Sequence, residues 1–403
     1  MVKQLKKLGP GLLFAGAAIG VSHLVQSTRA GADFGFGLIW ALLLVNLFKY
    51  PFFQFGPRYA MATGESLLDG YKKLGKGVLL LYTILTLATM FTIQTAVTIV
   101  TAGIATQLFG MGDIVIWSII ITFICLLILL IGKYQLLDKA IKVIIIILTI
   151  STLIAVFAAI FRSEKPISLA QSFPTTEAGI IFLIAFMGWM PAPLDISIWH
   201  SLWAVEKKKE TTDFSPKNAL FDFNLGYITT VILGIAFVSL GALVMFGSGE
   251  TFSNQGAVFA GQLINLYTNS LGDTLYIIIA IAALTTMFST TLTTLDASPR
   301  AMNKSIELFQ NKTIKSGYLV WILVLAGGTS VILAFFLSEM GMLVKIATIL
   351  SFITAPFYAI VNFVLISGKH TPKEWRPSIV IKIISYLGIV FLLGFSIWYI
   401  TII

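Results

Sequence analysis

The chain of 403 residues is 57% hydrophobic and only 11% charged, and it carries a formal net charge of +9. Soluble domains contain about 25% charged residues, so the composition excludes a soluble globular protein and indicates one that crosses a membrane many times. The single cysteine, Cys125, excludes both a disulfide within the chain and a cluster of thiolate metal ligands.

Apolar runs long enough to cross a bilayer occur eleven times in the sequence. One crossing of about 30 Å needs about 20 apolar residues. The first run is not followed by a small-residue cleavage site, so we expect it to stay in the mature chain. The stretch 248–270 predicts a short amphipathic surface helix, and polar loops are expected at 57–76, 204–218 and 296–316. The predicted spans are 10–30, 36–56, 77–109, 113–132, 139–161, 179–203, 219–246, 271–295, 317–337, 341–367 and 379–402.

The first and sixth spans are each interrupted by helix-breaking residues. The first contains GAAIGVSH at 16–23, and the sixth contains MGWMPAPLD at 187–195. Glycine lowers helix stability, and proline removes a backbone donor and clashes with the preceding turn. We therefore expect each span to unwind into two half-helices near the middle of the bilayer. A break in the first span of each five-span unit is the pattern by which inverted-repeat transporters build a binding site.

Lysine and arginine are distributed unevenly between the two sides of the predicted spans. Of the 27 basic residues, 22 lie before the first span or in loops that follow even-numbered spans, whereas only Arg162 and Lys165 lie on the opposite side. The positive-inside rule then places the N-terminus in the cytoplasm and the C-terminus outside, in a plasma (inner) membrane. On the same grounds, the run 207–209 is a topology signal and does not indicate a nucleic-acid partner.

Three side chains at the breaks are candidate metal ligands. His23 offers an imidazole, which transition metals favour and which titrates near neutral pH, although His23 and Ser22 could instead cap the outer half-helix. Met190 offers a thioether, or it simply packs. Asp195 lies in the expected first turn of the inner half-helix, where the helix dipole stabilises any acid. His23 and Asp195 are also the candidates for a proton relay.

The backbone at the breaks does not decide whether the substrate is a cation or an anion. Carbonyl ends of half-helices favour cations and amide ends favour anions. Carbonyls such as those of Ala17, Ala18 and Met187 would help to hold a cation. The glycine-rich segment that ends at Gly20 also resembles the break of amino-acid transporters, in which free amides hold a carboxylate.

Other polar residues inside the spans have two interpretations. Asp222, Asn224 and Asp296 lie at the inner ends of spans seven and eight, where they line an exit vestibule or reach the interface. A set of mostly hydroxyl side chains in spans three and eight has helical spacing, and it either forms interhelical hydrogen bonds or lines a wet path. This set is Thr92, Gln94, Thr95, Thr98, Thr285, Thr286, Ser289, Thr290 and Thr293.

The segment 9–44 resembles the first two helices of the Nramp divalent-metal transporters. Its GPG start at 9–11, AGA at 30–32 and GFG at 35–37 have the family's spacing, and Met190-Pro191 followed by His200-Ser201 resembles the family's sixth helix. The chain departs from the family at the metal site. Gly20 stands where the family has its metal-binding aspartate and His23 where it has an asparagine, and Ala192 replaces a histidine.

The resemblance implies an all-α integral membrane protein of about 11 helices in a LeuT-type 5+5 inverted repeat with helices 1 and 6 broken. The whole chain, 1–403, forms one transporter domain, with repeats at about 9–162 and 177–367 and an extra helix at about 379–402. The expected function is secondary transport of a divalent metal cation by alternating access. The alternative is a LeuT-fold transporter of an amino acid or another small organic solute.

Enzymatic activity is not expected, because the sequence contains no HExxH, no GxSxG and no nucleotide-binding glycine loop. The expected partners are the lipid bilayer and the metal cation substrate, with possible proton coupling and no resident cofactor. The predicted substrate-binding residues are Gly20, Ser22, His23, Met187, Met190 and Asp195, of which His23, Met190 and Asp195 would bind the metal.

Overall fold

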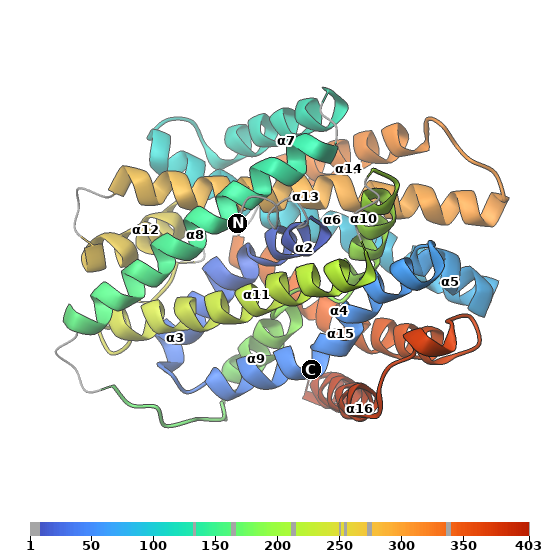
Figure 1. Ribbon diagram of the computed structural model, residues 1–403. Helices are drawn as coiled ribbons and strands as arrows, with labels where there is room; N and C mark the ends of the chain where they lie inside the picture. The colour runs from blue at the N-terminus through green and yellow to red at the C-terminus, as the bar shows by residue number, and fades with distance from the viewer. Residues whose placement is uncertain are drawn as a thin grey trace.

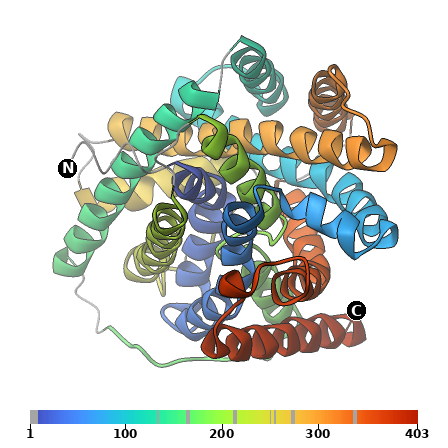
Figure 2. The ribbon, with the colours of Figure 1, turned by 45° about the vertical axis from the view of Figure 1, so that its right-hand side comes forward.

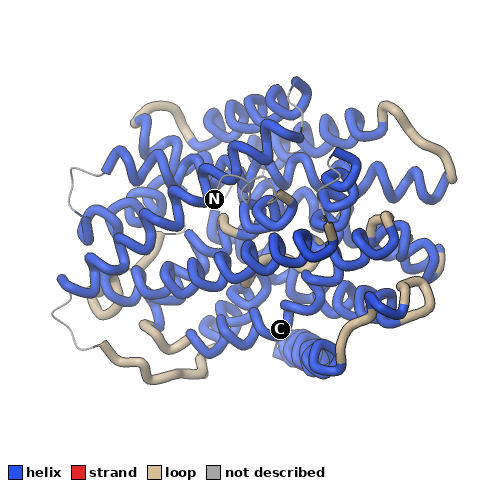
Figure 3. The backbone as a smooth tube through the Cα atoms, viewed as in Figure 1, coloured by secondary structure: helices blue, strands red, loops and turns tan. Residues whose placement is uncertain are grey.

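The computed structural model describes residues 9–131, 134–162, 167–210, 215–249, 251–253, 256–271, 276–335 and 340–402. All regular secondary structure in these ranges is helical, and Figure 3 draws no strand in them. The helices are α2 (Pro10–Ala18), the π-helix η1 (Ser22–Ser27), α3 (Thr28–Phe34), α4 (Ile39–Thr63), α5 (Leu67–Leu74), α6 (Lys76–Phe109), α7 (Ile114–Ile131), α8 (Tyr134–Arg162), α9 (Glu177–Trp189), α10 (Ile196–Glu210), α11 (Pro216–Val244), α12 (Gly256–Leu271), α13 (Tyr276–Gln310), α14 (Gly317–Phe335), α15 (Met340–Ser367), the 3-10 helix η3 (Lys373–Trp375) and α16 (Ile379–Ile402).

The predicted helical membrane architecture is confirmed. Seven described helices are long and apolar enough to cross a membrane, and the bent pair Pro10–Ala18 and Ser22–Phe34 brings the number to eight. The other three predicted spans correspond to α8, to α9 with α10, and to α13. The surface helix predicted within 248–270 is present as α12.

All three stretches predicted as polar loops are helical over much of their length, since 204–218 also contains the end of α10 and the start of α11. Helix α4 continues to Thr63 and is followed by α5, and α13 continues to Gln310. The segment 301–310 contains no glycine or proline and is rich in good helix formers. The fall in hydropathy there marks where the helix leaves the bilayer, and it does not mark the end of the helix.

The broken first span lies in the middle of the bundle. Figure 1 shows α2 near the centre, where it contacts α8, α10, α11 and α13. Helices α12 and α5 lie at opposite ends of the bundle in the same view, and we call these the α12 end and the α5 end. Figure 2 shows α16 along the outer edge, where it packs against α4 and α15.

Glycines allow the broken span to pack backbone to backbone against α11. A carbon added at Gly11 would lie 2.2 Å from the carbonyl oxygen of Asp222, and one added at Gly226 would lie 2.1 Å from the carbonyl oxygen of Gly11. On the other half of the span, carbons added at Gly31 and Gly241 would lie 2.0 Å and 2.1 Å from carbonyl oxygens of the facing helix. Only glycine fits at these positions, because any side chain would collide with main chain that cannot move aside.

Asp222 caps the first helix and does not line a vestibule. Its Oδ2 accepts hydrogen bonds from the backbone amides of Gly9 (3.1 Å) and Gly11 (2.7 Å), and its side chain is buried. The first amides of a helix have no partner within the helix, and a carboxylate there satisfies both their hydrogen bonds and the helix dipole. The GPG motif therefore supplies two donors for Asp222 and close contact with α11.

Candidate functional site at two helix breaks

The first break separates α2 from η1. Helix α2 ends at Ala18, the π-helix begins at Ser22, and the two parts of the span are bent by 46°. The hydroxyl of Thr290 on α13 lies within hydrogen-bond distance of the carbonyl oxygens of Gly16 (3.2 Å) and Ile19 (3.3 Å) at the unwound turn, and of Thr286 (3.3 Å) in its own helix. A carbon added at Gly20 would lie 2.5 Å from Thr290 Oγ1. Thr290 thus occupies the space that a side chain at position 20 would need.

His23 is held on both sides of its ring. Nε2 lies 2.9 Å from the Thr230 carbonyl oxygen and Nδ1 lies 3.1 Å from that of Ala18, and the ring is fully buried. The Ser22 hydroxyl lies 2.6 Å from Nδ1 and 2.5 Å from the Ala18 carbonyl oxygen. A carbonyl oxygen only accepts, so Nε2 carries a proton and donates to Thr230. These contacts tie the carbonyl end of α2 to α11.

Met190 lies on the same side of the breaks as His23. The carbon that would be added at Gly234 on α11 lies 3.6 Å from Met190 Sδ and 3.8 Å from His23 Nε2, so both side chains face this glycine. The Ser27 hydroxyl donates to Met190 Sδ at 3.6 Å. A thioether, an imidazole and a hydroxyl therefore meet next to α11.

The second break holds a buried lysine. Helix α9 ends at Trp189, a cis peptide bond joins Met190 to Pro191, and α10 begins at Ile196. The ammonium group of Lys49 on α4 donates to three carbonyl oxygens here, those of Met187 (2.8 Å), Gly188 (2.7 Å) and Ala192 (3.3 Å). The Lys49 side chain is fully buried. Its positive charge lies at the carbonyl end of a half-helix, where the helix dipole is negative.

Asp195 lies directly before α10 and is 5% exposed, and its Oδ1 has no hydrogen-bond partner. The Asp195 carboxylate interacts electrostatically with the ammonium group of Lys49. It also interacts with the hydroxyl groups of Tyr71, Tyr82 and Tyr358. The hydroxyl groups of Tyr82 and Tyr358 are buried and interact with the hydroxyl group of Thr86. Asp195 therefore faces a polar cluster formed with α4, α5, α6 and α15, on a different side of the break from His23.

A small cavity of about 20 Å³ lies between the two breaks. That volume is close to the minimum that holds one water molecule. The cavity is mostly apolar and includes two tryptophans. Its lining residues are Ala17, Ala18, Val21, Ser22, Ile93, Val97, Trp189, Pro193, Ile196, Trp199, Thr290 and Thr294.

The predicted site residues thus lie in three neighbouring places. Ser22 lines the cavity, while His23 and Met190 meet beside α11. Asp195 faces Lys49, which also binds the carbonyl group of Met187. Gly20 packs on Thr290. In the described ranges, no three His, Cys, Asp or Glu side chains come close enough to hold a metal ion.

Two buried residues near the breaks were not assigned to the site by the sequence analysis, and one of them, Lys49, contributes to it directly. Lys49 is a charged residue in an apolar span, and a buried intramembrane charge by itself indicates function. His200 is buried beside α2, stacks on Phe14 at 5.8 Å, and has no partner at either ring nitrogen. Its neighbour Ser201 accepts a hydrogen bond from the Leu67 amide at the start of α5 (3.0 Å).

Some of the polar residues of spans three and eight form interhelical hydrogen bonds, whereas the hydroxyls of Thr92, Thr285, Thr286 and Thr293 donate to carbonyl oxygens of their own helices. Gln94 donates to the Thr291 carbonyl oxygen (3.2 Å) and accepts from Thr294 (2.6 Å), and the hydroxyls of Thr101 and Thr291 lie 2.7 Å apart. These contacts join α6 to α13 beside the cavity. Of the two interpretations given above, interhelical bonding accounts for Gln94.

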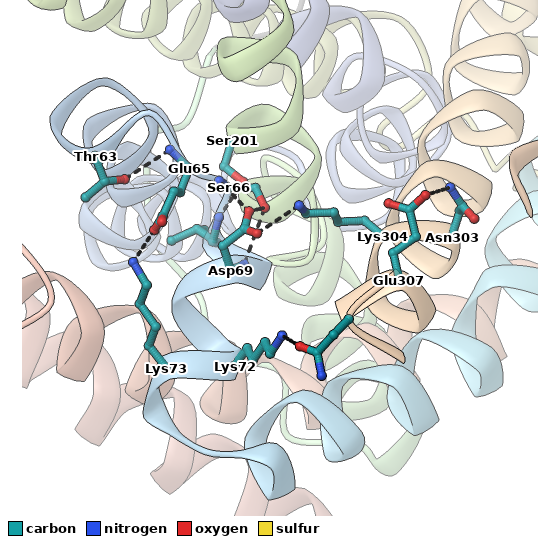
Figure 4. A network of polar contacts seen from close by, with 12 residues as sticks. Thr63, Glu65, Ser66, Asp69, Lys72, Lys73, Ser201, Asn303, Lys304 and Glu307 are labelled. Atoms are coloured by element: carbon teal, nitrogen blue, oxygen red, sulfur yellow. Dashed lines mark hydrogen bonds and ion pairs between the residues drawn. The ribbon is translucent and has the colours of Figure 1, made fainter. Parts of the chain in front are cut away.

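A polar network lies at the α5 end, and Figure 4 shows its contacts. Asp69 binds Lys304 on α13 at 2.8 Å and accepts from Ser66, while Glu65 pairs with Lys73. Burial raises the pKa of Asp69, but the hydrogen bonds from Lys304 and Ser66 outweigh it and hold this pKa below its ordinary value. The network borders a cavity of about 470 Å³.

Two of the polar residues expected to face a vestibule or the interface, Asp296 and Asn224, have side-chain partners. Asp296 accepts from Arg300 and Tyr318, at 2.7 Å each, and the side-chain oxygen of Asn224 accepts from Tyr50 at 2.8 Å. Tyr318 and Arg300 line the cavity of the α5 end. Asp296 therefore helps to position the wall of this cavity.

Comparisons with known proteins agree on one family. A family model described as natural resistance-associated macrophage protein-like (Nramp) matches residues 11–401. An uncharacterized protein of Pasteurella multocida is 37% identical over 98% of this chain and 92% of its own length. A manganese transporter of Eremococcus coleocola superposes with a TM-score of 0.77 at 15% identity, covering 98% of this chain and 86% of that one.

The fold is shared more widely. The transporter MhsT, solved in complex with L-phenylalanine, superposes with a TM-score of 0.68 at 14% identity, over 96% of this chain and 98% of that one. These structural matches place the chain in the LeuT fold, with the first and sixth helices broken as predicted. With a family match across nearly its whole length, this chain belongs to the Nramp family of membrane transporters, which are not enzymes.

Proposed function

We propose that this protein moves a metal cation across the membrane by alternating access, using the two helix breaks as its binding region. The observation that carries the proposal is the second break, where three carbonyl oxygens converge on one positive group and the Asp195 carboxylate lies nearby with an unpartnered oxygen. Converging carbonyls and a carboxylate are oxygen ligands suited to cations such as Mn²⁺, Mg²⁺ and Ca²⁺. One structural neighbour, from Eremococcus coleocola, is a manganese transporter.

The proposed orientation has the N-terminus and the α5 end in the cytoplasm, in a plasma (inner) membrane. It rests on the excess of lysine and arginine in the loops of that end. The metal crosses between the α12 end and the α5 end past the cavity that separates the breaks.

Uptake of Mn²⁺ into proteoliposomes tests the function. We expect Asp195→Asn and Met190→Ala each to lower uptake, because each removes a candidate ligand at one break. Lys209→Ala is the control, since its side chain is 68% exposed at the end of α10. Parent-like uptake by both break variants, with a loss in Lys209→Ala, would place the site elsewhere.

A second candidate function is transport of a small organic solute, which the lining of the central cavity favours. Trp189 and Trp199 border the cavity with mostly apolar neighbours, a lining that suits an organic side chain, although the cavity would have to widen well beyond its 20 Å³ to admit one. Binding of an amino-acid panel to the same preparations distinguishes the two functions. Saturable amino-acid uptake without any Mn²⁺ uptake would replace the metal assignment.

A further inference from the structure

Lys49 has all of its hydrogen-bonding capacity used by the second break. An ammonium group has three donors and no acceptor, and Lys49 directs its ammonium to three carbonyl oxygens between 2.7 and 3.3 Å away. Burying a charge in the middle of a membrane span is costly unless it is paired and hydrogen-bonded. The contacts with the carbonyls, together with the nearby Asp195 carboxylate, supply that compensation.

The three oxygens that hold the ammonium are also the ones that a cation would use. They belong to the end of α9 and to the unwound turn after it, which is where broken membrane helices coordinate cations. A metal ion bound to these oxygens would lie within about 3 Å of them, so it cannot share them with the Lys49 ammonium. The carbonyl group of Met187, one of the three, was predicted from the sequence to bind substrate.

We propose that Lys49 is a resident cation that competes with the transported metal ion for the carbonyl end of α9, and that it thereby sets how tightly the protein binds metal. The inference rests on the proposed cation transport. Lys49 and Asp195 together have no net charge, so a divalent ion that enters beside both of them gains little electrostatic attraction. An ion that displaces the ammonium group gains the three carbonyls and the carboxylate.

Two substitutions remove the competing charge in different ways. Lys49→Gln keeps a neutral donor for the carbonyls, and Lys49→Met removes the donor but keeps the length of the side chain. We expect both to bind Mn²⁺ about tenfold more tightly than the parent, measured by calorimetry on protein in nanodiscs, because a like charge has been removed from the site. Lys345→Met, which removes an exposed lysine on α15, is the matched control and should bind Mn²⁺ as the parent does.

An unchanged or weaker affinity in a monodisperse Lys49→Gln protein would overturn the inference. If the parent nevertheless takes up Mn²⁺, the proposed function stands without it. If the parent takes up no Mn²⁺ while Lys49→Gln binds it more tightly, the resident cation is supported and the proposed function fails.

The parent protein itself provides a second test, in which a variant serves only to assign one resonance. The ammonium resonance of Lys49 in protein labelled with ¹⁵N-lysine can be assigned by its absence from Lys49→Arg. Saturating Mg²⁺ should shift this resonance, because the ammonium leaves the carbonyls. A resonance that stays in place at saturation contradicts the competition.

Discussion

At the scale of single residues, Gly20 shows how a small change in one helix is matched by a residue on another. Its position is where the Nramp resemblance places a metal-binding aspartate, and here the adjacent space is filled by Thr290. The hydroxyl of Thr290 also lies within hydrogen-bond distance of two carbonyl oxygens of the unwound turn. The absence of a side chain at position 20 and the presence of Thr290 therefore go together, because the threonine fills the space that an aspartate would need.

Adding a side chain at Gly20 should destabilise the protein. We expect Gly20→Ala to lower the melting temperature, since overpacking costs about 1–3 kcal/mol. Gly327→Ala on α14, where an added carbon meets nothing within 4 Å, is the control and should leave the melting temperature unchanged. Equal melting temperatures for the two variants would show that Thr290 moves aside easily.

The same contact decides how a restored carboxylate behaves. Gly20→Asp alone should fold poorly, whereas Gly20→Asp with Thr290→Ala should recover stability and bind Mn²⁺ more tightly than the parent. Calorimetry on both proteins measures this. Tighter binding by the single variant, with full stability, would mean that the threonine does not control access to this position.

His23 is the other residue whose role depends on its contacts. Both ring nitrogens face backbone carbonyl oxygens, which favours the capping role over the proton relay. We expect His23→Gln to lower stability by about 1–3 kcal/mol, the cost of leaving a buried partner unpaired, and to leave the pH profile of uptake unchanged. A shifted pH profile would return His23 to the proton pathway.

At the scale of elements, both breaks could be predicted because their cause is local. Glycine and proline disturb a helix wherever they lie, and both spans unwind at the predicted residues. Lys49 could not be placed in the same way. Its partner Met187 is 138 residues away in the sequence, and only tertiary packing shows that a lysine of the second span reaches the carbonyls of the sixth. The pairing of Gly20 with Thr290 escaped prediction for the same reason.

The contact between the broken span and α11 leads to a prediction about this pair of elements. We expect Gly241→Ala to reduce the yield of folded protein in membranes, because the added carbon would lie 2.1 Å from a carbonyl oxygen of α3. Gly394→Ala on α16, where nothing lies within 4 Å, is the control. Size-exclusion profiles of the two variants give the measurement, and a parent-like profile for Gly241→Ala would show that the helices can separate.

At the scale of the whole molecule, the proposed orientation is open to direct test. On a Cys125→Ala background, a membrane-impermeant maleimide should label M111C on intact cells and K208C only after permeabilisation. Met111 is 70% exposed and lies next to α7, whereas Lys208 lies near the α5 end. The reverse pattern would invert the topology, and with it the side from which substrate enters.

The unbroken helix α11 has a consequence for how such a molecule can move. It runs without interruption from Pro216 to Val244 and touches both halves of the broken first span through glycine contacts too close to slide. Because the continuous helix α11 packs closely against both halves of the first span, it fixes the angle between them. The two halves of the first span therefore cannot swing independently, and α2, α3 and α11 must travel as one block. A motion that exposes the cavity would then occur between this block and the helices that α2 contacts on its other sides, α8, α10 and α13.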